Sequence, residues 1–185
     1  GLVGSEMCIR DRDCTLELDI SMDEEEVARV SVSHPEMAGN ITVDVFHNQI
    51  FRTSTHHGGW CWSPDNPKLF KVKAVLWRGK ETADEVESYF GMRKIHTDQG
   101  MVYLNNRPFY QKLILDQGYW KDSLMTARCD EDFKKDILLA KEMGFNGCRK
   151  HQKTEDPRFL YWADRLGYIA VSYTHLRAHE TGAYL

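Results

Sequence analysis

The stretch HHGGWCW (56–62) holds three side chains that commonly bind metal ions, His56, His57 and Cys61. The two histidines are adjacent, so on an extended strand they would point in opposite directions. The set also has none of the ligand spacings that are typical of zinc sites. We therefore predict no metal here and interpret the stretch as a packed loop near a domain boundary.

Polar residues follow two apolar runs farther along the chain. Asp116 and Gln117 end the run QKLILDQ (111–117), and the series Arg149 to His151 closes the shorter run FNGCR (145–149). If both runs are strands of one parallel sheet, their ends meet at one edge, and Asp116, Arg149 and His151 become neighbours. An arginine can hold a carboxylate by two parallel hydrogen bonds.

The segments around these residues alternate between strand and helix. The dense apolar run 111–117 indicates a strand buried on both faces. EDFKKDILLAKEM (131–143) has an apolar helical face, with Asp130 as its cap and Gly144 just beyond its end. A second helix is predicted from Asp156-Pro157 to Gly167. The order β-α-β-α-β predicts parallel strands with right-handed crossovers.

The first half of the chain has the pattern of short strands separated by turns. The four candidate strands are VARVSVS (27–33), ITVDVFHNQIF (41–51), LFKVKAVLW (69–77) and VESYFGMRKI (86–95). Their alternation and spacing predict a β-sandwich. The run DEEE (23–26) indicates a solvated turn or a charged sheet edge. MVYLNNRPFY (101–110) predicts a hairpin that turns at Asn105-Asn106. We expect one domain over 13–98 and another over 99–170.

The two ends of the chain are related at the level of DNA. Leu2 to Asp11 can be encoded by codons whose reverse complement encodes Val171 to Glu180. This relationship is typical of one sequencing-adapter element read on both strands. We therefore interpret residues 1–12 and 171–185 as adapter-derived and non-native, and expect the remainder to be an internal fragment of a longer protein.

The composition narrows the class of protein further. With 24 basic and 28 acidic residues, the net charge is −4, which argues against a nucleic-acid-binding face. No apolar run is long enough to span a bilayer, so no membrane partner is expected. The cysteines outside 1–12 have no CxxC spacing, which favours free thiols and a reducing, cytoplasmic location. We expect no cofactor.

Five stretches together resemble glycoside hydrolase family 2, which includes β-galactosidases, β-glucuronidases and β-mannosidases. They are WSPDNPKLF (62–70), YFGMRKI (89–95), VYLNNRPF (102–109), DILLAKEMGFNGCRKH (136–151) and DPRFLYWADRLGYI (156–169). The resemblance implies an immunoglobulin-like β-sandwich followed by the first two βα units of a truncated (β/α)8 TIM barrel. It also implies a retaining exo-glycosidase that acts on terminal β-glycosides, with a carbohydrate as its substrate. A homo-oligomeric parent is left open.

The resemblance also implies roles for individual residues. Both catalytic glutamates of such enzymes follow later barrel strands, so no catalytic residue is assigned and the fragment is predicted to be inactive. Arg149 matches the arginine of an Asn-x-x-Arg motif, which lies under the nucleophile and keeps it ionised; the alternative is a structural ion pair inside the barrel mouth. His151 follows Arg149 by two residues where many members have three, so it either contacts the sugar or packs. Asp116 stands where many members have an Asn-x-His stretch, and its carboxylate could bind two sugar hydroxyls. Tyr119 and Trp120 either stack on a sugar or cover the barrel mouth or the sandwich interface.

Two other classes of protein stay open at this point. The first is a non-catalytic carbohydrate-binding or interaction module made of the β-sandwich alone, which would not need the β-α-β-α-β segment. The second is a doubly wound α/β enzyme. That fold predicts a glycine-rich phosphate loop after its first strand, whereas LDQGYWKDS (115–123) has one glycine.

Overall fold

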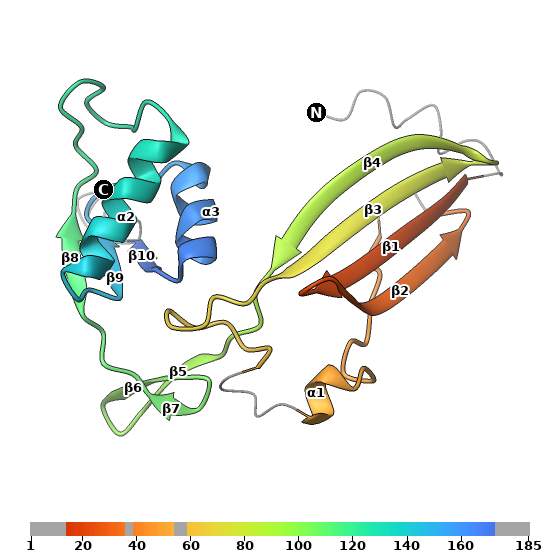
Figure 1. Cartoon of the computed structure of the whole chain (residues 1–185), viewed down its shortest axis with the longest axis horizontal. Helices are drawn as coiled ribbons and strands as arrows, with labels where there is room; N and C mark the ends of the chain where they lie inside the picture. The colour runs from red at the N-terminus through yellow and green to blue at the C-terminus, as the bar shows by residue number, and fades with distance from the viewer. Residues whose placement is uncertain (1–13, 36–38, 54–58, 173–185) are drawn as a thin grey trace, which may run out of the picture. The chain divides into compact units, whose positions relative to one another are not determined.

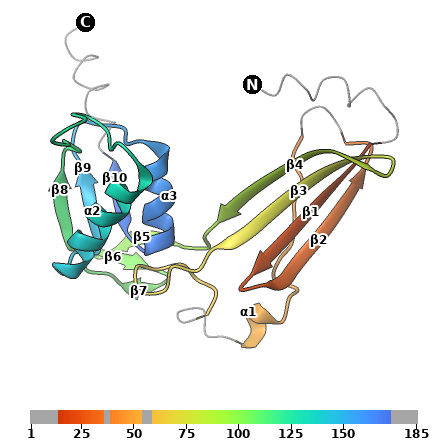
Figure 2. The same ribbon diagram turned by 45° about the horizontal axis from the view of Figure 1, so that its top comes forward.

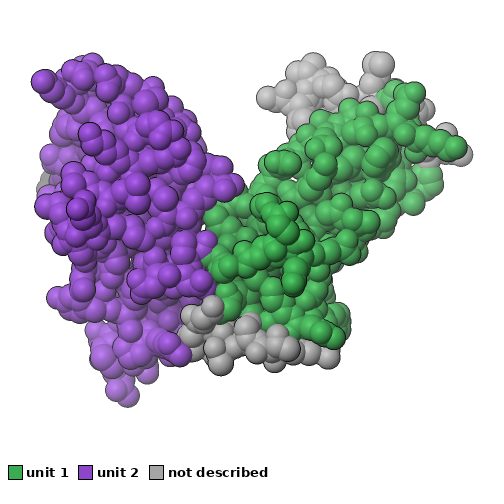
Figure 3. Space-filling view, viewed as in Figure 1, with its two compact units in different colours: residues 1–60, 68–92 green, residues 61–67, 93–185 purple. Residues whose placement is uncertain are grey.

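The computed structural model describes residues 14–35, 39–53 and 59–172, which belong to two compact units (Figure 3). The first unit comprises residues 1–60 and 68–92, and the second comprises 61–67 and 93–185. The division at residues 92 and 93 lies a few residues before the predicted boundary at 98. The loop 61–67, which sequence patterns assigned to the sandwich, packs with the second unit. Residues 1–12 and most of 171–185, interpreted as adapter-derived, lie outside the described residues.

One four-stranded antiparallel sheet forms the framework of the first unit (Figures 1 and 2). In the order β2-β1-β3-β4, its strands are β2 Glu25–Ser33, β1 Cys14–Met22, β3 Phe70–Arg78 and β4 Glu81–Phe90. Asp23 and Glu24 join β1 to β2 with φ of 50° and 67°, the conformation of a tight hairpin whose twist matches its strands. The DEEE run is therefore the turn and the start of an edge strand, as predicted.

Aromatic rings fill the core of the first unit. Phe70 is fully buried and stacks on Phe90, with ring centroids 4.9 Å apart. Phe51 also stacks on Phe70, with ring centroids 5.9 Å apart. Such pairs contribute beyond the apolar area that they bury. The core thus joins β3 and β4 to a segment far from them in sequence.

The strand predicted over 41–51 is absent, and this prediction is wrong. In this segment, side-chain oxygens accept backbone hydrogen bonds that a strand would make with a neighbouring strand. Asp44 accepts one from Phe46 N (3.0 Å), and Asn48 accepts one from Ile50 N (2.9 Å). Such local bonds favour turns over strands. Here they lead into the short helix α1 (Ile50–Thr53). Val45 of this segment is nevertheless buried in the core.

The second unit contains a small antiparallel sheet and a parallel sheet. The antiparallel strands are β5 Ile95–Asp98, β6 Met101–Leu104 and β7 Arg107–Pro108. Asn105 and Asn106 make the predicted turn, with φ of 52° and 64°. The parallel sheet has the order β8-β9-β10 and alternates with two helices: β8 Leu113–Asp116, α2 Asp130–Glu142, β9 Gly147–Lys150, α3 Pro157–Leu166 and β10 Ile169–Ser172.

The helix ends follow most of the predicted signals. Asp156 caps α3 by accepting a hydrogen bond from Arg158 N, and Gly144 (φ 91°) follows α2. The prediction that Asp130 caps α2 is wrong. Cys129 occupies that position without a side-chain cap bond, and Asp130 is the first helical residue, where its charge favours the helix dipole.

Both helices lie on one face of the parallel sheet (Figure 2). Phe133, Ile137 and Phe159 are fully buried between helices and sheet, together with Cys148 of β9. The prediction that β8 is buried on both faces is wrong, because Leu115 on the other face is 58% exposed. The described sheet therefore has one covered face and one open face.

Candidate functional site

The ends of the three parallel strands place the predicted site residues at one edge of the sheet. Strand register aligns Asp116 with Lys150, and Leu115 with Arg149 and Val171. Successive side chains of a strand point to opposite faces. Asp116 and Lys150 therefore lie on the helix side, while Arg149 lies on the open side. The sequence analysis correctly placed Asp116 and Arg149 at the same end of the sheet. It did not predict that their side chains lie on opposite faces.

Lys150 is the centre of a buried ion cluster on the helix side. Its side chain is 3% exposed, and its ammonium group pairs with Asp116 and with Glu155 Oε2, the latter at 2.7 Å. Lys153 Nζ lies 3.0 Å from Glu155 Oε1. Each of these buried charges has a partner of opposite sign, which is the condition under which buried ions are tolerated. Asp136 of α2 is a further neighbour, and burial and the charge of Asp116 raise the pKa of its carboxyl group.

The environment of Lys150 keeps it protonated. Burial by itself lowers the pKa of this amine, but the hydrogen bonds to Asp116 and Glu155 outweigh burial and raise the pKa above its ordinary value. The ammonium group also lies 3.9 Å from the centre of the Phe159 ring. A permanently charged amine surrounded in this way is suited to hold other groups in place rather than to exchange protons.

Asp116 is occupied by the chain itself. One carboxylate oxygen pairs with Lys150, and the other accepts a hydrogen bond from Gly118 N at 2.7 Å. The predicted sugar contact of Asp116 therefore has no support in this geometry. Its position indicates a structural role instead, in fixing the turn that follows β8.

Arg149 and His151 lie where the open face meets the strand ends. Arg149 is half-buried in a row with Leu115 and Val171. His151 is also half-buried, and its backbone N–H donates to Asp116 O at 2.9 Å, which extends the β8-β9 pairing beyond the strand. Gln152 then reverses the chain with a φ of 55°. These two side chains have the chemistry to contact a carboxylate or a hydroxyl group.

The two neighbouring aromatic residues differ in burial. Trp120 is part of the core, with its ring edge-on to Phe133 at 5.8 Å. Tyr119 is 70% exposed. Trp120 thus covers the helix side of the strand ends, and Tyr119 is the aromatic side chain that is accessible from solvent.

The metal-ligand types of 56–62 form no cluster in the part of the structure that can be described. His56 and His57 lie outside the described residues. Cys61 is buried, and burial raises the pKa of its thiol. Across residues 14–35, 39–53 and 59–172, no three side chains of His, Cys, Asp or Glu are placed to hold a metal ion. Over the same residues, no helix has both the length and the apolar character to cross a membrane.

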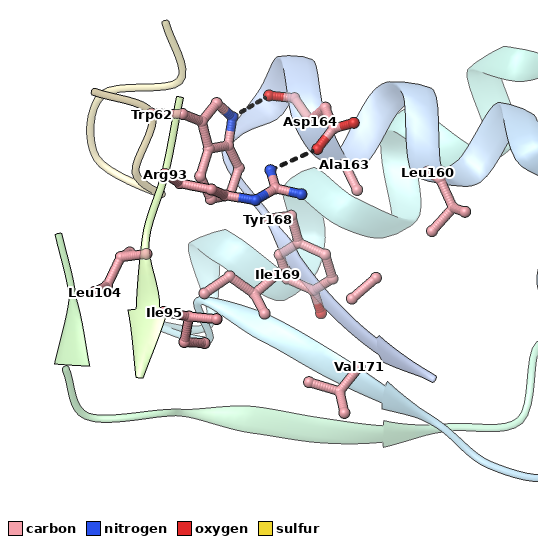
Figure 4. A pocket seen from close by; sticks show the side chains of 11 residues that line it. Trp62, Arg93, Ile95, Leu104, Leu160, Ala163, Asp164, Tyr168, Ile169 and Val171 are labelled. Atoms are coloured by element: carbon pink, nitrogen blue, oxygen red, sulfur yellow. Dashed lines mark hydrogen bonds and ion pairs between the residues drawn. The ribbon is translucent and has the colours of Figure 1, made fainter. Parts of the chain in front are cut away.

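A cavity of about 540 Å³ lies beside β10 (Figure 4). Ile169 and Val171 of β10 line it, as do Leu160 of α3 and the buried ring of Tyr168. At its rim, Asp164 accepts a hydrogen bond from Trp62 Nε1 at its backbone oxygen (2.7 Å). Its carboxylate accepts one from Arg93 (3.0 Å). The cavity is mainly apolar, and its strand is the edge of the parallel sheet.

Sequence reasoning missed Lys150, Lys153 and Glu155. The available signal was the charge pattern of RKHQKTED (149–156), in which basic and acidic residues crowd around a strand end. That pattern is equally typical of a solvated loop, so the cluster became visible only when strand register and burial were known.

Comparison with known proteins gives the lineage. Residues 9–93 match the model of the family described as glycosyl hydrolases family 2. A β-galactosidase of Klebsiella pneumoniae (strain 342) is 27% identical over 120 residues, which are 64% of this chain and 11% of that protein. A β-glucuronidase of Streptococcus agalactiae is 23% identical over 149 residues, 80% of this chain and 24% of that protein. Over residues 9–93, the chain is similar to the family 2 glycosyl hydrolases.

Solved structures show a similar fold. The β-glucuronidase of Parabacteroides merdae superposes with a TM-score of 0.69 at 15% identity, covering 86% of this chain and 19% of that protein. The family model covers the first unit, and the structural match extends over most of the second. The chain spans between about a tenth and a quarter of the length of these proteins.

Proposed function

We propose that this chain is a segment of a retaining exo-glycosidase that hydrolyses terminal β-glycosides of the galactoside or glucuronide class. In this proposal the first unit is an immunoglobulin-like sandwich, and the second holds the first two βα units of a (β/α)8 barrel. Support comes from the curated relatives, which are named β-galactosidases and β-glucuronidases. The parallel order of β8, β9 and β10 with intervening helices also fits the start of such a barrel.

The observation that carries the proposal is the position of Arg149. In (β/α)8 barrels, substrates bind at the carboxyl ends of the strands, and Arg149 lies near the end of β9 on the face away from both helices. A guanidinium group there can hold a carboxylate ionised through two hydrogen bonds. We propose that Arg149 supports the nucleophilic glutamate and that His151 contacts the sugar.

The catalytic carboxylates themselves are not assigned to this chain. A retaining glycosidase needs two carboxyl groups roughly 5–5.5 Å apart, one as acid and one as nucleophile. The acidic pair near the strand ends, Asp116 and Glu155, is bound to Lys150 on the helix side. Neither is placed to protonate a leaving group on the open face. The 185-residue chain is therefore expected to be inactive by itself.

The cavity beside β10 fits the same proposal. An edge strand with half-buried apolar side chains is the surface on which a further parallel strand and its helix would pack. Ile169 of β10 and Leu160 of α3 provide such a surface. A sandwich module that binds carbohydrate without catalysis would have no need for this surface, which disfavours that alternative.

A sugar titration of the isotope-labelled chain tests the proposal. Methyl β-galactoside and methyl β-glucuronide are expected to shift the NMR signals of Arg149 and His151, with affinity on the order of millimolar because the pocket is incomplete. Arg149→Met should abolish the shift of His151, whereas Arg107→Met, at an exposed position of the same unit, should preserve the shifts of both residues. Release of nitrophenol from a nitrophenyl β-glycoside by the purified chain would contradict the proposal that this chain lacks the catalytic carboxylates.

A further inference from the structure

The ion cluster around Lys150 connects three segments that are separate in sequence. Asp116 belongs to β8 and Lys150 to β9, and Glu155 is the residue before the N-cap of α3. Glu155 also reaches the helix start directly, because its Oε1 accepts a hydrogen bond from Asp156 N at 2.9 Å. One ammonium group therefore links two strand ends and a helix N-terminus.

Lys153 extends this linkage to the long connection between β8 and α2. Its ammonium group donates to the backbone oxygens of Gly118, at 3.3 Å, and Met125, and it pairs with Glu155. Gly118 fits closely against the cluster: a Cβ at this position would lie 2.4 Å from Lys153 Nζ and 2.9 Å from Glu155 Oε2. The loops after β8 and β9 are thus packed against the same charges.

The cluster lies directly behind the proposed binding residues. Lys150 follows Arg149 and precedes His151, and the N–H of His151 is bonded to the backbone oxygen of Asp116. Any movement of Lys150 away from Asp116 would move both neighbours. Separating one member of this buried cluster would leave an unpaired charge away from water, so the three segments are expected to stay together.

We propose that Lys150 and Glu155 are positioning residues, which hold the loops after β8 and β9 as one unit and thereby fix Arg149 and His151 at the open face. This inference rests on the proposed function, because in that proposal Arg149 supports the nucleophile and His151 contacts the sugar. Asp116 then belongs to the positioning cluster rather than to the sugar site.

Amide hydrogen exchange of the whole 185-residue chain tests the link without any sugar. In Lys150→Met, Asp116 and Glu155 lose their shared cation. Exchange at the amides of Gly118, His151 and Asp156 should then accelerate by about tenfold or more. The amides of Asn146 and Ile169, which bond at the other end of the same sheet, should keep their rates. Lys135→Met, at an exposed position of α2, is the matched control and should change neither group.

A second variant protects the test if Lys150→Met does not fold. Glu155→Gln preserves shape and leaves the pair of Lys150 and Asp116 intact, so exchange should accelerate chiefly at Asp156. Equal acceleration at both ends of the sheet, or no acceleration at all, would overturn the positioning role, since the first indicates general destabilisation and the second no link.

The sugar titration separates this inference from the proposed function. Lys150→Met should reduce the sugar-induced shifts of Arg149 and His151 while exchange at Asn146 and Ile169 stays unchanged. Full sugar shifts in that variant would refute the positioning role. Absence of any sugar shift in the unsubstituted chain would instead refute the proposed function, whatever the exchange rates show.

Discussion

The backbone oxygen of Pro64 lies 2.3 Å from the point where a Cβ on Gly167 would be. Gly167 ends α3 in the left-handed region, with a φ of 71°. Glycine is therefore required twice at this position, by backbone conformation and by contact with the loop 61–67. The contact explains why that loop belongs to the second unit although strands of the first unit lie on both sides of it in sequence.

Alanine substitutions at two helix ends separate these requirements. Gly144 follows α2 with a φ of 91°, but a Cβ there would meet no atom within 4 Å. Gly144→Ala should cost about 1–2 kcal/mol, from backbone conformation alone. Gly167→Ala should cost about 1–3 kcal/mol more, because the Pro64 carbonyl must also move. Urea unfolding monitored by the second unit's tryptophans measures both, and equal costs would argue against a tightly packed loop.

Lys141 should stabilise the same contact between the loop 61–67 and the end of α3. Its ammonium group donates to the backbone oxygens of Pro64, Leu166 and Gly167, at 3.0, 2.6 and 2.9 Å. Lys141→Met would leave these three carbonyls without their donor, for which we expect a loss of about 2–3 kcal/mol. Lys135→Met on the same helix should have little effect. Similar urea midpoints for the two variants would show that water replaces the ammonium group without cost.

Local chemistry made much of the second unit predictable. Asn105-Asn106, Gly144 and Asp156 each have a residue type whose backbone preference is strong and independent of distant contacts. The alternation of strand and helix followed from spacing in the same way. The segment 41–51 was mispredicted because its apolar alternation suits a strand, whereas Asp44 and Asn48 bond to their own backbone neighbours.

The sequence predicted which end of the sheet holds the candidate site, but not the face to which each side chain points. Asp116 and Arg149 were identified because they end apolar runs, and both do lie at the carboxyl edge of the sheet. Which way each side chain points depends on strand register, where a shift of one residue reverses every orientation. No sequence pattern fixed that register, so Asp116 was assigned to the sugar site and Lys150 was overlooked.

The cysteines should differ sharply in reactivity. Cys129 is exposed at the start of α2, whereas Cys148 is fully buried in β9, where burial raises the pKa of its thiol to about 12. Because the thiolate is the reactive form, iodoacetamide at neutral pH should alkylate Cys129 and leave Cys148 intact until the chain is unfolded. Peptide mapping by mass spectrometry reads both sites, and comparable labelling of Cys148 in native buffer would mean that the helices do not cover β9.

Asp156 should make the stability of the second unit sensitive to acid. Hydrogen bonds from the side chain and the backbone N–H of Arg158 lower the pKa of Asp156 to about 2, from an ordinary 3.8. A folded-state pKa below the unfolded value means that the stabilisation is present above about pH 4 and is lost as the pH falls towards 2. Thermal unfolding across this range should show a steeper fall in melting temperature for the unsubstituted chain than for Asp156→Asn, which retains a capping oxygen but no charge. Other carboxylates titrate in both proteins, so the difference between the two curves isolates Asp156. Parallel curves would show that the cap stabilises α3 equally well when it is neutral.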